Sequence, residues 1–392
     1  MPSVLVVCPQ ERDLREIRLS GLGRSFCVCY EGADLDAIDD PFDPEVFLAR
    51  CQAQPVDGVV GTKDRSALLA SLVAERQGLP GPTPRALLAC QHKPTSRRLQ
   101  REVAPQAVPA FSLLDDRLSL QRAPFPPPFF VKPVVGRLSE NARRIDDVAQ
   151  LAVLHEDGYP GRYAAIARLA GLAPEQAHGF LAEELLDGQE VTLEGYCYRG
   201  KVTAIGITDS VKYPGTNSFQ RFEYPTSLPE ERQAELIALA ERVVPALGFD
   251  HGFFNVEAFV PDRGRIGLIE VNGRIASQFA PLVRALHGRS TYEALFQLAC
   301  GHDPRWQADP PQGVAVSYCL RVFADAYVER VPEPEEDLEI LVRPGLRLSE
   351  QGVNDAQSFR LAIFYEAGDT REEAIARCQA RARSLGFRLR PV

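Results

Sequence analysis

Three side chains that could ligate a metal through oxygen, Glu257, Glu270 and Asn272, stand in apolar stretches of the chain. Between them, residues 261–264 read Pro-Asp-Arg-Gly and predict a turn that folds the strand of Glu257 back beside the other two. Side chains two apart on a strand share a face, so Glu270 and Asn272 point the same way. A Mg²⁺ ion that also contacts nucleotide phosphates is typically held by one or two carboxylates and those phosphates. The spacing predicts a magnesium site on a hairpin; an edge hairpin with solvated carboxylates is the alternative that these residues leave open.

The composition is that of a globular protein with more than one domain. The chain has 392 residues, of which 45% are hydrophobic, enough for two or three domains with their own cores. Its net charge of −9 argues against a dominant surface for nucleic-acid phosphates. No apolar run approaches the roughly 18 residues of a membrane helix, and the first residues lack the basic stretch of a signal peptide. We expect no nucleic-acid partner, no membrane partner and a cytoplasmic location.

Cysteine and histidine spacing indicates neither a disulfide framework nor a transition-metal site. The nine cysteines include no C-x-x-C pair, and the six histidines include no H-E-x-x-H or H-x-H pattern. A free cysteine in an apolar strand or helix behaves as a small buried hydrophobe. We therefore expect free, mostly buried cysteines and structural histidines.

The first part of the chain has the pattern of a parallel α/β sheet. Residues 1–90 alternate short apolar strands with helical segments. Residues 78–84 contain two glycines and three prolines, which cannot continue a helix and mark the end of this unit. No G-x-G-x-x-G follows the first strand, so we do not expect a dinucleotide site there.

The sequence pattern after residue 90 predicts an α+β body followed by a strand-rich tail. The expected elements are a helical segment at 142–178, strands at 180–210, a helix at 228–247, the metal hairpin at 252–275 and a final helix near 370–377. Proline-rich breaks at 124–128 and 303–311 separate them. We expect three domains, at residues 1–90, 91–305 and 306–392.

Four motifs occur in a fixed order along the chain. Residues 91–99 carry Lys93 after a Gly-Leu-Pro-Gly-Pro phrase, and 131–139 carry Lys132 before a loop. Residues 183–190 read E-E-x-x-x-G-x-E, and the metal hairpin ends in E-x-N-x-R. Each motif alone could be a surface lysine, a solvated helix face or an ion-pair partner. In this joint order, over essentially its whole length, the chain resembles ATP-grasp proteins such as biotin carboxylase, D-alanine:D-alanine ligase and the L-amino-acid ligases.

The resemblance implies the ATP-grasp fold, of α/β and α+β class. Its three parts would be a parallel α/β N-terminal domain, a two-lobed ATP-grasp nucleotide-binding body at 91–305 and a strand-rich C-terminal domain. The resemblance also implies that Lys93 and Lys132 bind the ATP phosphates, and that the loop N–H groups and Ser139 close on the γ-phosphate. Only Gly136 stands in this loop, where many relatives carry several glycines.

The E-E-x-x-x-G-x-E motif resembles the linker that holds the base and ribose in this family. The resemblance implies that Glu183 meets the adenine amino group and that backbone groups of Glu184 and Leu186 pair with the adenine edge. Glu190 would take the ribose hydroxyls, since a carboxylate can accept from two vicinal hydroxyls. Leucine side chains beside them would supply apolar walls for the base.

The activity that the resemblance implies is an ATP-dependent carboxylate–amine ligase. A small-molecule carboxylate would be phosphorylated to an acyl phosphate, an amine would displace the phosphate, and ADP and phosphate would be released. The cofactors would be ATP and Mg²⁺, or Mn²⁺ in its place, with amino acids as expected substrates and a homodimer as expected assembly. Arg274 and Lys132 are the candidate catalytic residues, and the planar guanidinium of Arg274 suits a substrate carboxylate or the acyl phosphate.

Residues 205–225 are the expected specificity element, because this loop carries charged and aromatic residues between two strands. Lys212, Arg221 and Glu223 could bind the charged ends of an amino-acid-like substrate; plain surface charge is the alternative. Two other activities stay open. The tail around residues 368–374 resembles the last domain of biotin carboxylase and leaves a carboxylation reaction open, and a non-catalytic ATP-binding sensor is the other.

Overall fold

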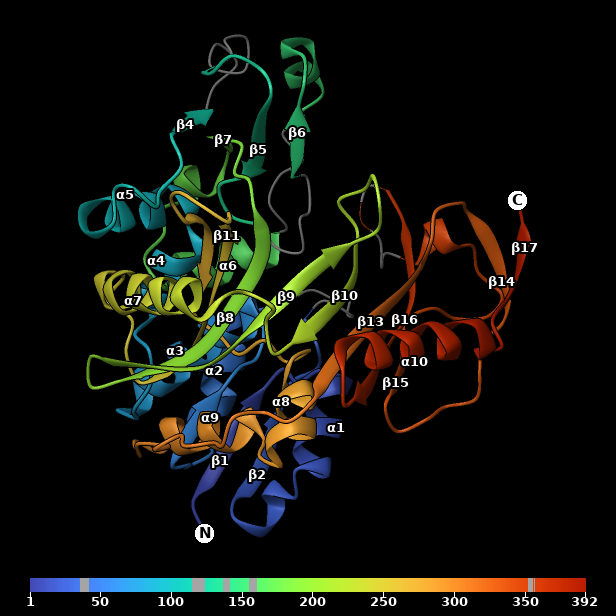
Figure 1. Cartoon of the computed structure of the whole chain (residues 1–392). Coiled ribbons are helices and arrows are strands. Elements are labelled where there is room, and N and C mark those ends of the chain that lie inside the picture. The colour runs from blue at the N-terminus through green and yellow to red at the C-terminus, as the bar shows by residue number, and fades with distance from the viewer. Residues whose placement is uncertain (36–41, 115–123, 137–141, 155–160, 352–354, 356) are drawn as a thin grey trace. The chain divides into compact units, whose positions relative to one another are not determined.

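The computed structural model describes residues 1–35, 42–114, 124–136, 142–154, 161–351, 355 and 357–392 (Figure 1). The chain packs into two compact units, and each is described by itself. Unit 1 consists of Met1–Ile205, Leu228–Ser277 and Tyr292–Trp306, and unit 2 of Gly206–Ser227, Gln278–Thr291 and Gln307–Val392. The expected three-domain division cuts the chain differently and stays a prediction.

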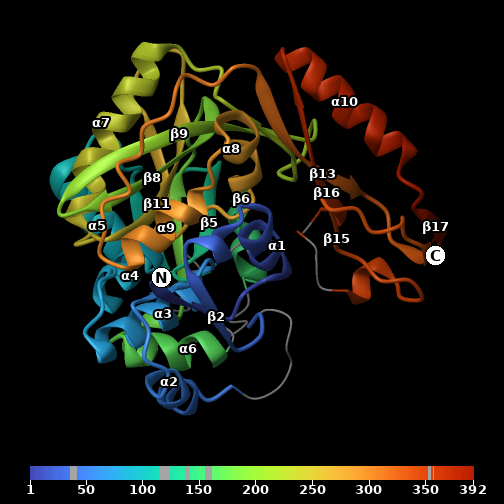
Figure 2. The same ribbon diagram turned by 90° about the horizontal axis from the view of Figure 1, so that it is seen from below.

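Unit 1 begins with the parallel α/β sheet that the alternating pattern predicts. Strand β1 (Ser3–Val7) lies between β2 (Cys27–Glu31) and β3 (Gly58–Val60), and both pairings are parallel. Four consecutive residues of β1 are fully buried, and α3 packs against β1 and β3. Helix α3 also packs against α2, and both helices are labelled in Figure 2. The helices of this part are α1 (Glu11–Leu19), α2 (Pro44–Gln52) and α3 (Asp64–Gln77).

Helix α3 stops where the glycine- and proline-rich segment predicts. Its C-cap is Gly78, whose φ of +66° is the left-handed conformation that glycine adopts without a Cβ clash. Helix α4 (Pro84–Gln91) starts afresh with Thr83 as N-cap, whose hydroxyl accepts from the Ala86 N–H at 3.2 Å. Helix α5 (Lys93–Val103) follows directly and carries Lys93 at its first position.

An antiparallel sheet of strand order β4-β7-β5-β6 follows in unit 1. Phe129, Val131, Ile145 and Ala182 are buried in its core. The elements of this part are β4 (Phe111–Leu114), β5 (Phe129–Pro133), β6 (Arg143–Ile145), α6 (Gly161–Leu169) and β7 (Phe180–Glu184). The expectation of helix from residue 142 is wrong at β6, because pairing with β5 and burial of Ile145 override a weak local preference; α6 confirms its middle part.

The last part of unit 1 is built on strands β12-β11-β8, which pair antiparallel. The helix expected at 228–247, the strands expected at 180–210 and the hairpin at 252–275 are confirmed. Their bounds are β8 (Gln189–Tyr198), β9 (Lys201–Lys212, which continues into unit 2), α7 (Glu230–Ala246), β11 (Gly252–Val260), β12 (Gly267–Asn272) and α9 (Thr291–Ala299).

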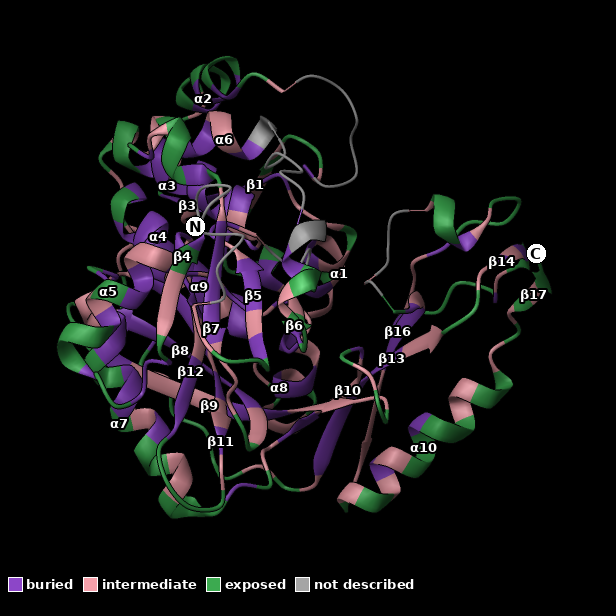
Figure 3. Cartoon of the chain, turned by 90° about the horizontal axis from the view of Figure 1, so that it is seen from above, coloured by how far each residue is buried: buried purple, intermediate pink, exposed green. Residues whose placement is uncertain are grey.

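Unit 2 contains the strand-rich tail and the end of β9. Its strands follow the order β9-β10-β13-β16-β15, and β14 pairs with β17. Helix α10 lies against β13 and β16, where Ala374 and Cys378 are buried while other parts of the helix are exposed (Figure 3). The bounds are β10 (Phe219–Tyr224), α8 (Ala280–His287), β13 (Val314–Val322), β14 (Ala326–Arg330), β15 (Leu338–Ile340), β16 (Phe359–Gly368), α10 (Arg371–Ser384) and β17 (Arg388–Pro391). None of the helices in the described part of the chain combines the length and apolarity needed to cross a membrane.

Candidate active site

The hairpin of β11 and β12 brings the three predicted metal ligands together. In its register Glu257 lies opposite Glu270, and Asn255 lies opposite Asn272. Directly opposed residues of an antiparallel pair share a face. The side-chain nitrogen of Asn272 lies 3.2 Å from Glu257 Oε1 and 3.2 Å from Glu270 Oε1. The side chains therefore meet in one small space, and their role as metal ligands stays a prediction.

The electrostatics of this space suit a bound cation. The pKa of Glu257 is raised to about 8 because its carboxyl group is withdrawn from solvent and because the Glu270 and Glu190 carboxylates lie near it. The oxygen and nitrogen of an asparagine amide are nearly interchangeable in shape, so a half-turn of Asn272 would present its oxygen. Among the described residues, no three or more His, Cys, Asp or Glu side chains form a metal site. Two carboxylates and one amide oxygen fit a Mg²⁺ ion that completes its shell with phosphate oxygens.

Lys132 lies on β5 in a buried ion cluster. Its Nζ is 2.7 Å from Glu183 Oε2 and donates to the Ile269 carbonyl at 3.2 Å. Burial lowers the pKa of Lys132, and Glu183 opposes that shift. The Ile269 contact places this ammonium beside the strand of Glu270, and the binding of ATP phosphates by Lys132 stays a prediction.

Arg97, on α5, completes this cluster and was not among the predicted site residues. Its Nε donates to Glu183 Oε1 at 2.5 Å, and another guanidinium nitrogen donates to the Ile269 carbonyl at 2.6 Å. Burial would raise the pKa of Glu183, but Arg97 and Lys132 outweigh it and lower the pKa to about 2. Because Glu183 is committed to two cations, its contact with the adenine amino group stays a prediction.

Lys93 faces the beginning of the predicted phosphate loop. Its Nζ donates to the Gly136 carbonyl at 3.1 Å, and its N–H donates to the Val134 carbonyl at 2.9 Å. The ring of His92 holds this turn through Thr95 and the Gln176 carbonyl. Lys93 is therefore buried at the start of α5 rather than loose on the surface. Ser139 lies outside the described residues.

The predicted base and ribose residues lie at the end of β7, in the turn that follows it and at the start of β8. Glu184 forms an ion pair with Arg265, and Glu190 lies opposite Phe259 in the β8–β11 register. Gly188 has a φ of +120°, and a Cβ there would lie 2.4 Å from the Pro261 nitrogen, so only glycine fits this turn. Leu186 packs closely on Gly267, where a Cβ would lie 2.5 Å from its Cδ2. The turn is tightly built, and the nucleotide contacts of Glu184, Leu186 and Glu190 stay predictions.

Arg274 follows the metal strand and is held by a partner that the sequence did not reveal. Its Nε donates to Asp64 Oδ1 at 2.8 Å, and Asp64 is the first residue of α3. The pKa of Arg274 is raised despite burial, because Asp64, Glu257 and Glu270 surround the guanidinium with negative charge. A small cleft opens beside Asp64 and is lined by Asp64, Arg65, Cys90, Gln91, Lys93, Val135, Gly136, Tyr163, Glu270 and Asn272.

The predicted substrate residues of unit 2 are already engaged with neighbours. Arg221 Nε donates to Glu223 Oε1 at 2.6 Å, and Arg371 forms a second ion pair with Glu223. Lys212 lies over the Phe219 ring, with its Nζ 5.4 Å from the ring centroid. These contacts indicate a structural role, and substrate binding by Lys212 or Arg221 stays a prediction.

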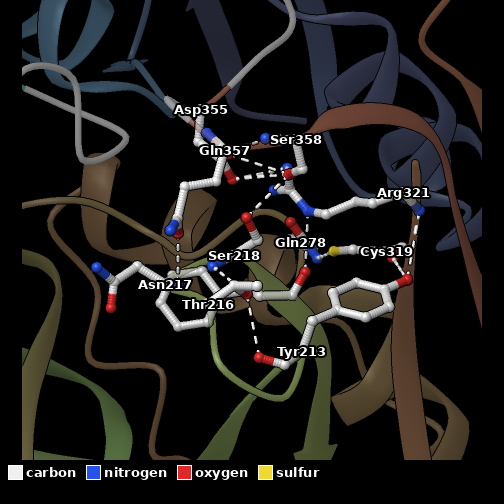
Figure 4. Close-up of polar contacts among 11 residues, drawn as sticks. Tyr213, Thr216, Asn217, Ser218, Gln278, Cys319, Arg321, Asp355, Gln357 and Ser358 are labelled. Carbon is white, nitrogen blue, oxygen red and sulfur yellow. Dashed lines mark hydrogen bonds and ion pairs between the residues drawn. The ribbon is translucent and has the colours of Figure 1, made fainter. Parts of the chain in front are cut away.

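A second polar cluster of unit 2 is built around Arg321 on β13 (Figure 4). Its guanidinium donates to Asp355 at 2.9 Å, to Ser358 at 2.9 Å and to the Phe219 carbonyl at 3.0 Å. Tyr213 joins the cluster through the Cys319 carbonyl and the Arg321 N–H. These bonds tie the end of β9, β13 and the segment before β16 together.

Comparison with known proteins matches part of the chain to a domain family. Residues 125–281 match the sequence model of the ATP-grasp domain. That range includes Lys132, the linker at residues 183–190 and the metal hairpin. The chain therefore carries an ATP-grasp domain.

Individual relatives are similar to the chain at modest identity. Carnosine synthase 1 of Mus musculus is 25% identical over 339 residues, which is 82% of this chain and 38% of that protein. Carnosine synthase 1 of Gallus gallus is 28% identical over 349 residues, covering 83% and 35%. The chain thus spans little more than a third of the length of these relatives.

Solved structures resemble the chain over nearly its full length. An L-amino acid ligase from Bacillus licheniformis superposes with a TM-score of 0.78 at 18% identity, covering 99% of this chain and 98% of that one. The biotin carboxylase domain of a Hydrogenobacter thermophilus carboxylase, solved with MgADP and bicarbonate, gives 0.71 at 14% identity, covering 99% and 91%. These matches confirm the predicted ATP-grasp fold.

Proposed function

We propose that this protein is an ATP-dependent ligase that activates a carboxylate as an acyl phosphate and joins it to an amine, releasing ADP and phosphate. One observation carries the proposal: Glu257, Glu270 and Asn272 share one face of a hairpin, with Lys132 against the backbone of the same strand. Arg274 follows that strand and is ringed by carboxylates. The likeness to carnosine synthases and to an L-amino acid ligase supports amino acids as substrates.

Each side chain has a defined task in this reaction. Lys93 and Lys132 bind phosphate oxygens of ATP and neutralise part of their charge. A Mg²⁺ ion, or Mn²⁺ in its place, held by Glu257, Glu270 and Asn272 would neutralise charge on the β- and γ-phosphates. Arg274 holds the substrate carboxylate in line with the γ-phosphorus, and then donates to oxygens that gain charge during acyl transfer.

The proposed substrates, assembly and location of the protein go with this function. Its partners would be a small-molecule acid and a small-molecule amine, and a homodimer is proposed because the biotin carboxylase relative was solved as a dimer. A cytoplasmic location is proposed because all nine cysteines are free thiols.

The test is a product analysis with purified protein, ATP, Mg²⁺ and an equimolar pool of L-amino acids. We expect ADP and one phosphate for each amide formed, and a hydroxamate when hydroxylamine replaces the amine, because it traps the acyl phosphate. Arg274→Ala should suppress both the amide and the hydroxamate. Arg144→Ala is the matched control, since Arg144 is an exposed arginine of β6 paired with Asp146.

Other products would point to the other activities. A requirement for bicarbonate and biotin would favour the carboxylase reaction, to which the likeness to biotin carboxylase structures also leads. Tight ATP binding without turnover across the pool would favour a sensor. AMP and pyrophosphate as products would contradict the acyl-phosphate mechanism.

A further inference from the structure

Glu194 is a buried carboxylate on the same sheet face as the proposed metal ligands. It lies on β8 directly opposite Asn255 of β11, and Asn255 in turn lies opposite Asn272 of β12. Opposed residues share a face, so the row runs from Asn272 through Asn255 to Glu194. The next row along the strands is Glu270, Glu257 and Thr192. Glu194 is 3% exposed.

The two oxygens of Glu194 have different surroundings. Oε1 accepts from the Ala276 N–H at 2.7 Å. Oε2 is buried and has no hydrogen-bond partner among the described residues. A buried oxygen that makes no hydrogen bond is costly, because the lost water is not replaced. Such an oxygen is explained if a ligand donates to it when bound.

Glu194 also lies next to the segment that carries Arg274. Ala276, whose N–H donates to Glu194, is two residues after Arg274. The Arg274 carbonyl accepts a hydrogen bond from the Asn255 side-chain amide at 3.1 Å. Burial raises the pKa of Glu194 to about 8, with the Ala276 N–H and the Arg274 charge acting in the other direction. A group that binds here would therefore lie close to whatever Arg274 holds.

The chemistry of this position favours an ammonium group over a metal ion. A hard divalent cation requires six or more oxygen ligands, and Glu194 offers a single open carboxylate oxygen beside a guanidinium. An ammonium group needs only hydrogen-bond acceptors, and one good carboxylate partner compensates its charge. Its arrival would also restore the ionised form of Glu194, because an opposite charge favours the carboxylate.

We propose, resting on the ligase function above, that Glu194 receives the ammonium group of the amine substrate and accepts one of its protons before acyl transfer. The proton passes from nitrogen to Oε2, and the freed lone pair forms the C–N bond with the acyl carbon. The C–O bond to phosphate breaks with its electron pair leaving on phosphate, which takes the second nitrogen proton. Glu194 then returns its own proton to solvent when the product leaves.

The test compares two nucleophiles in wild type and Glu194→Gln. The glutamine keeps an oxygen for the Ala276 N–H but cannot accept a proton at the open position. The amines are the equimolar pool of L-amino acids, whose amino groups are protonated near neutral pH, and hydroxylamine, which is uncharged there and needs no proton acceptor. We expect amide formation to fall by about 100-fold, the scale of a lost general base. Hydroxamate formation and the KM for ATP should stay near their wild-type values.

Two further variants keep the test decisive. Glu194→Asp keeps the charge but withdraws the carboxylate, so it should raise the KM for the amine without affecting hydroxylamine, and it replaces the glutamine variant if that one does not fold. Asp13→Asn is the matched control, because Asp13 is a buried carboxylate of α1 that accepts from Thr62 at 2.7 Å and from the Gln10 N–H at 2.7 Å. It should leave both rates unchanged.

Equal loss of amide and hydroxamate in the Glu194 variants would overturn the inference and assign Glu194 to positioning Arg274. Unchanged rates with both nucleophiles would overturn it as well. If the wild-type protein makes neither amide nor hydroxamate, the ligase proposal itself fails. If the wild type forms amide and the Glu194 variants form it equally well, only the inference about Glu194 fails.

Discussion

Replacing Arg97 with methionine should destabilise the protein by several kcal/mol, although Arg97 touches no substrate in the proposed mechanism. Arg97 and Glu183 have side-chain exposures of only 2% and 6%. The guanidinium also donates to Gln100 Oε1 at 2.8 Å and to the Ile269 carbonyl at 2.6 Å. Removing one partner of a buried ion pair typically costs about 3–5 kcal/mol, and we expect the lower end because Lys132 still pairs with Glu183.

The pKa of Glu183 gives a second measure of the same interaction. It is about 2, against an ordinary value of 4.5. At about 1.36 kcal/mol per unit, the surroundings of Glu183, in which the two cations outweigh burial, contribute a net of roughly 3 kcal/mol above pH 4.5. Since the folded-state pKa is depressed, this contribution is present above the unfolded value and is lost as the pH falls toward 2. Lys132 remains in the variant, so Arg97→Met should raise the pKa of Glu183 only part of the way back to its ordinary value.

The assay is urea unfolding followed by far-UV circular dichroism, near neutral pH and across the acid range. We expect Arg97→Met to lower the free energy of unfolding by about 3 kcal/mol and to reduce the wild-type loss of stability between pH 4.5 and about 2. Arg144→Met is the control, because Arg144 and Asp146 are 53% and 57% exposed, and an exposed pair contributes about 0–1 kcal/mol. An equal, small effect of both substitutions, or an unchanged acid profile, would refute the reasoning.

Three other outcomes are expected. Glu270→Gln and Asn272→Ala should each abolish phosphate release while the protein stays folded, and near-normal ATP consumption by both would remove the metal assignment. Lys132→Ala should weaken ATP binding by about 1–3 kcal/mol, the scale of a charge-assisted hydrogen bond, and Glu190→Ala should cost less; unchanged nucleotide affinity for Lys132→Ala in calorimetry would contradict its role. The pKa of Glu257 is raised from 4.5 to about 8. Its burial therefore costs no folding stability below pH 4.5, and the cost grows as the pH rises from 4.5 toward 8. Thermal melting should therefore show a larger gain from MgATP at high pH, and Glu257→Gln should flatten that pH dependence.

The hairpin and the individual motifs could be predicted from the sequence because each depends on residues close together in the chain. The period of two, the Pro-Asp-Arg-Gly turn and the E-x-N spacing lie within a few residues of one another, and the observed register agrees with them. The failure at β6 has the opposite cause. Its residues are helix-compatible by themselves, and only the pairing with β5 makes them a strand.

The partners that complete the site could not be predicted because they come from distant parts of the chain. Arg97 and Glu183 are 86 positions apart, and Arg274 and Asp64 are 210 apart. Glu194 and the Ala276 N–H are 82 positions apart. In the sequence, Arg97 resembles any arginine of an amphipathic helix and Asp64 any acidic residue at a helix start, so only tertiary packing distinguishes them.

The register of three strands links the metal ligands to the proposed amine site. Glu194, Asn255 and Asn272 form one cross-strand row, and Thr192, Glu257 and Glu270 form the next. In a strand a shift of one residue turns every side chain to the opposite face, so neither row can move alone. The distance between the metal side and the amine side is thus set by backbone hydrogen bonds rather than by a loop. Because acyl transfer requires the nucleophile and the acyl phosphate to be held within about 0.5 Å of their productive geometry, a rigid sheet face is a suitable place for both.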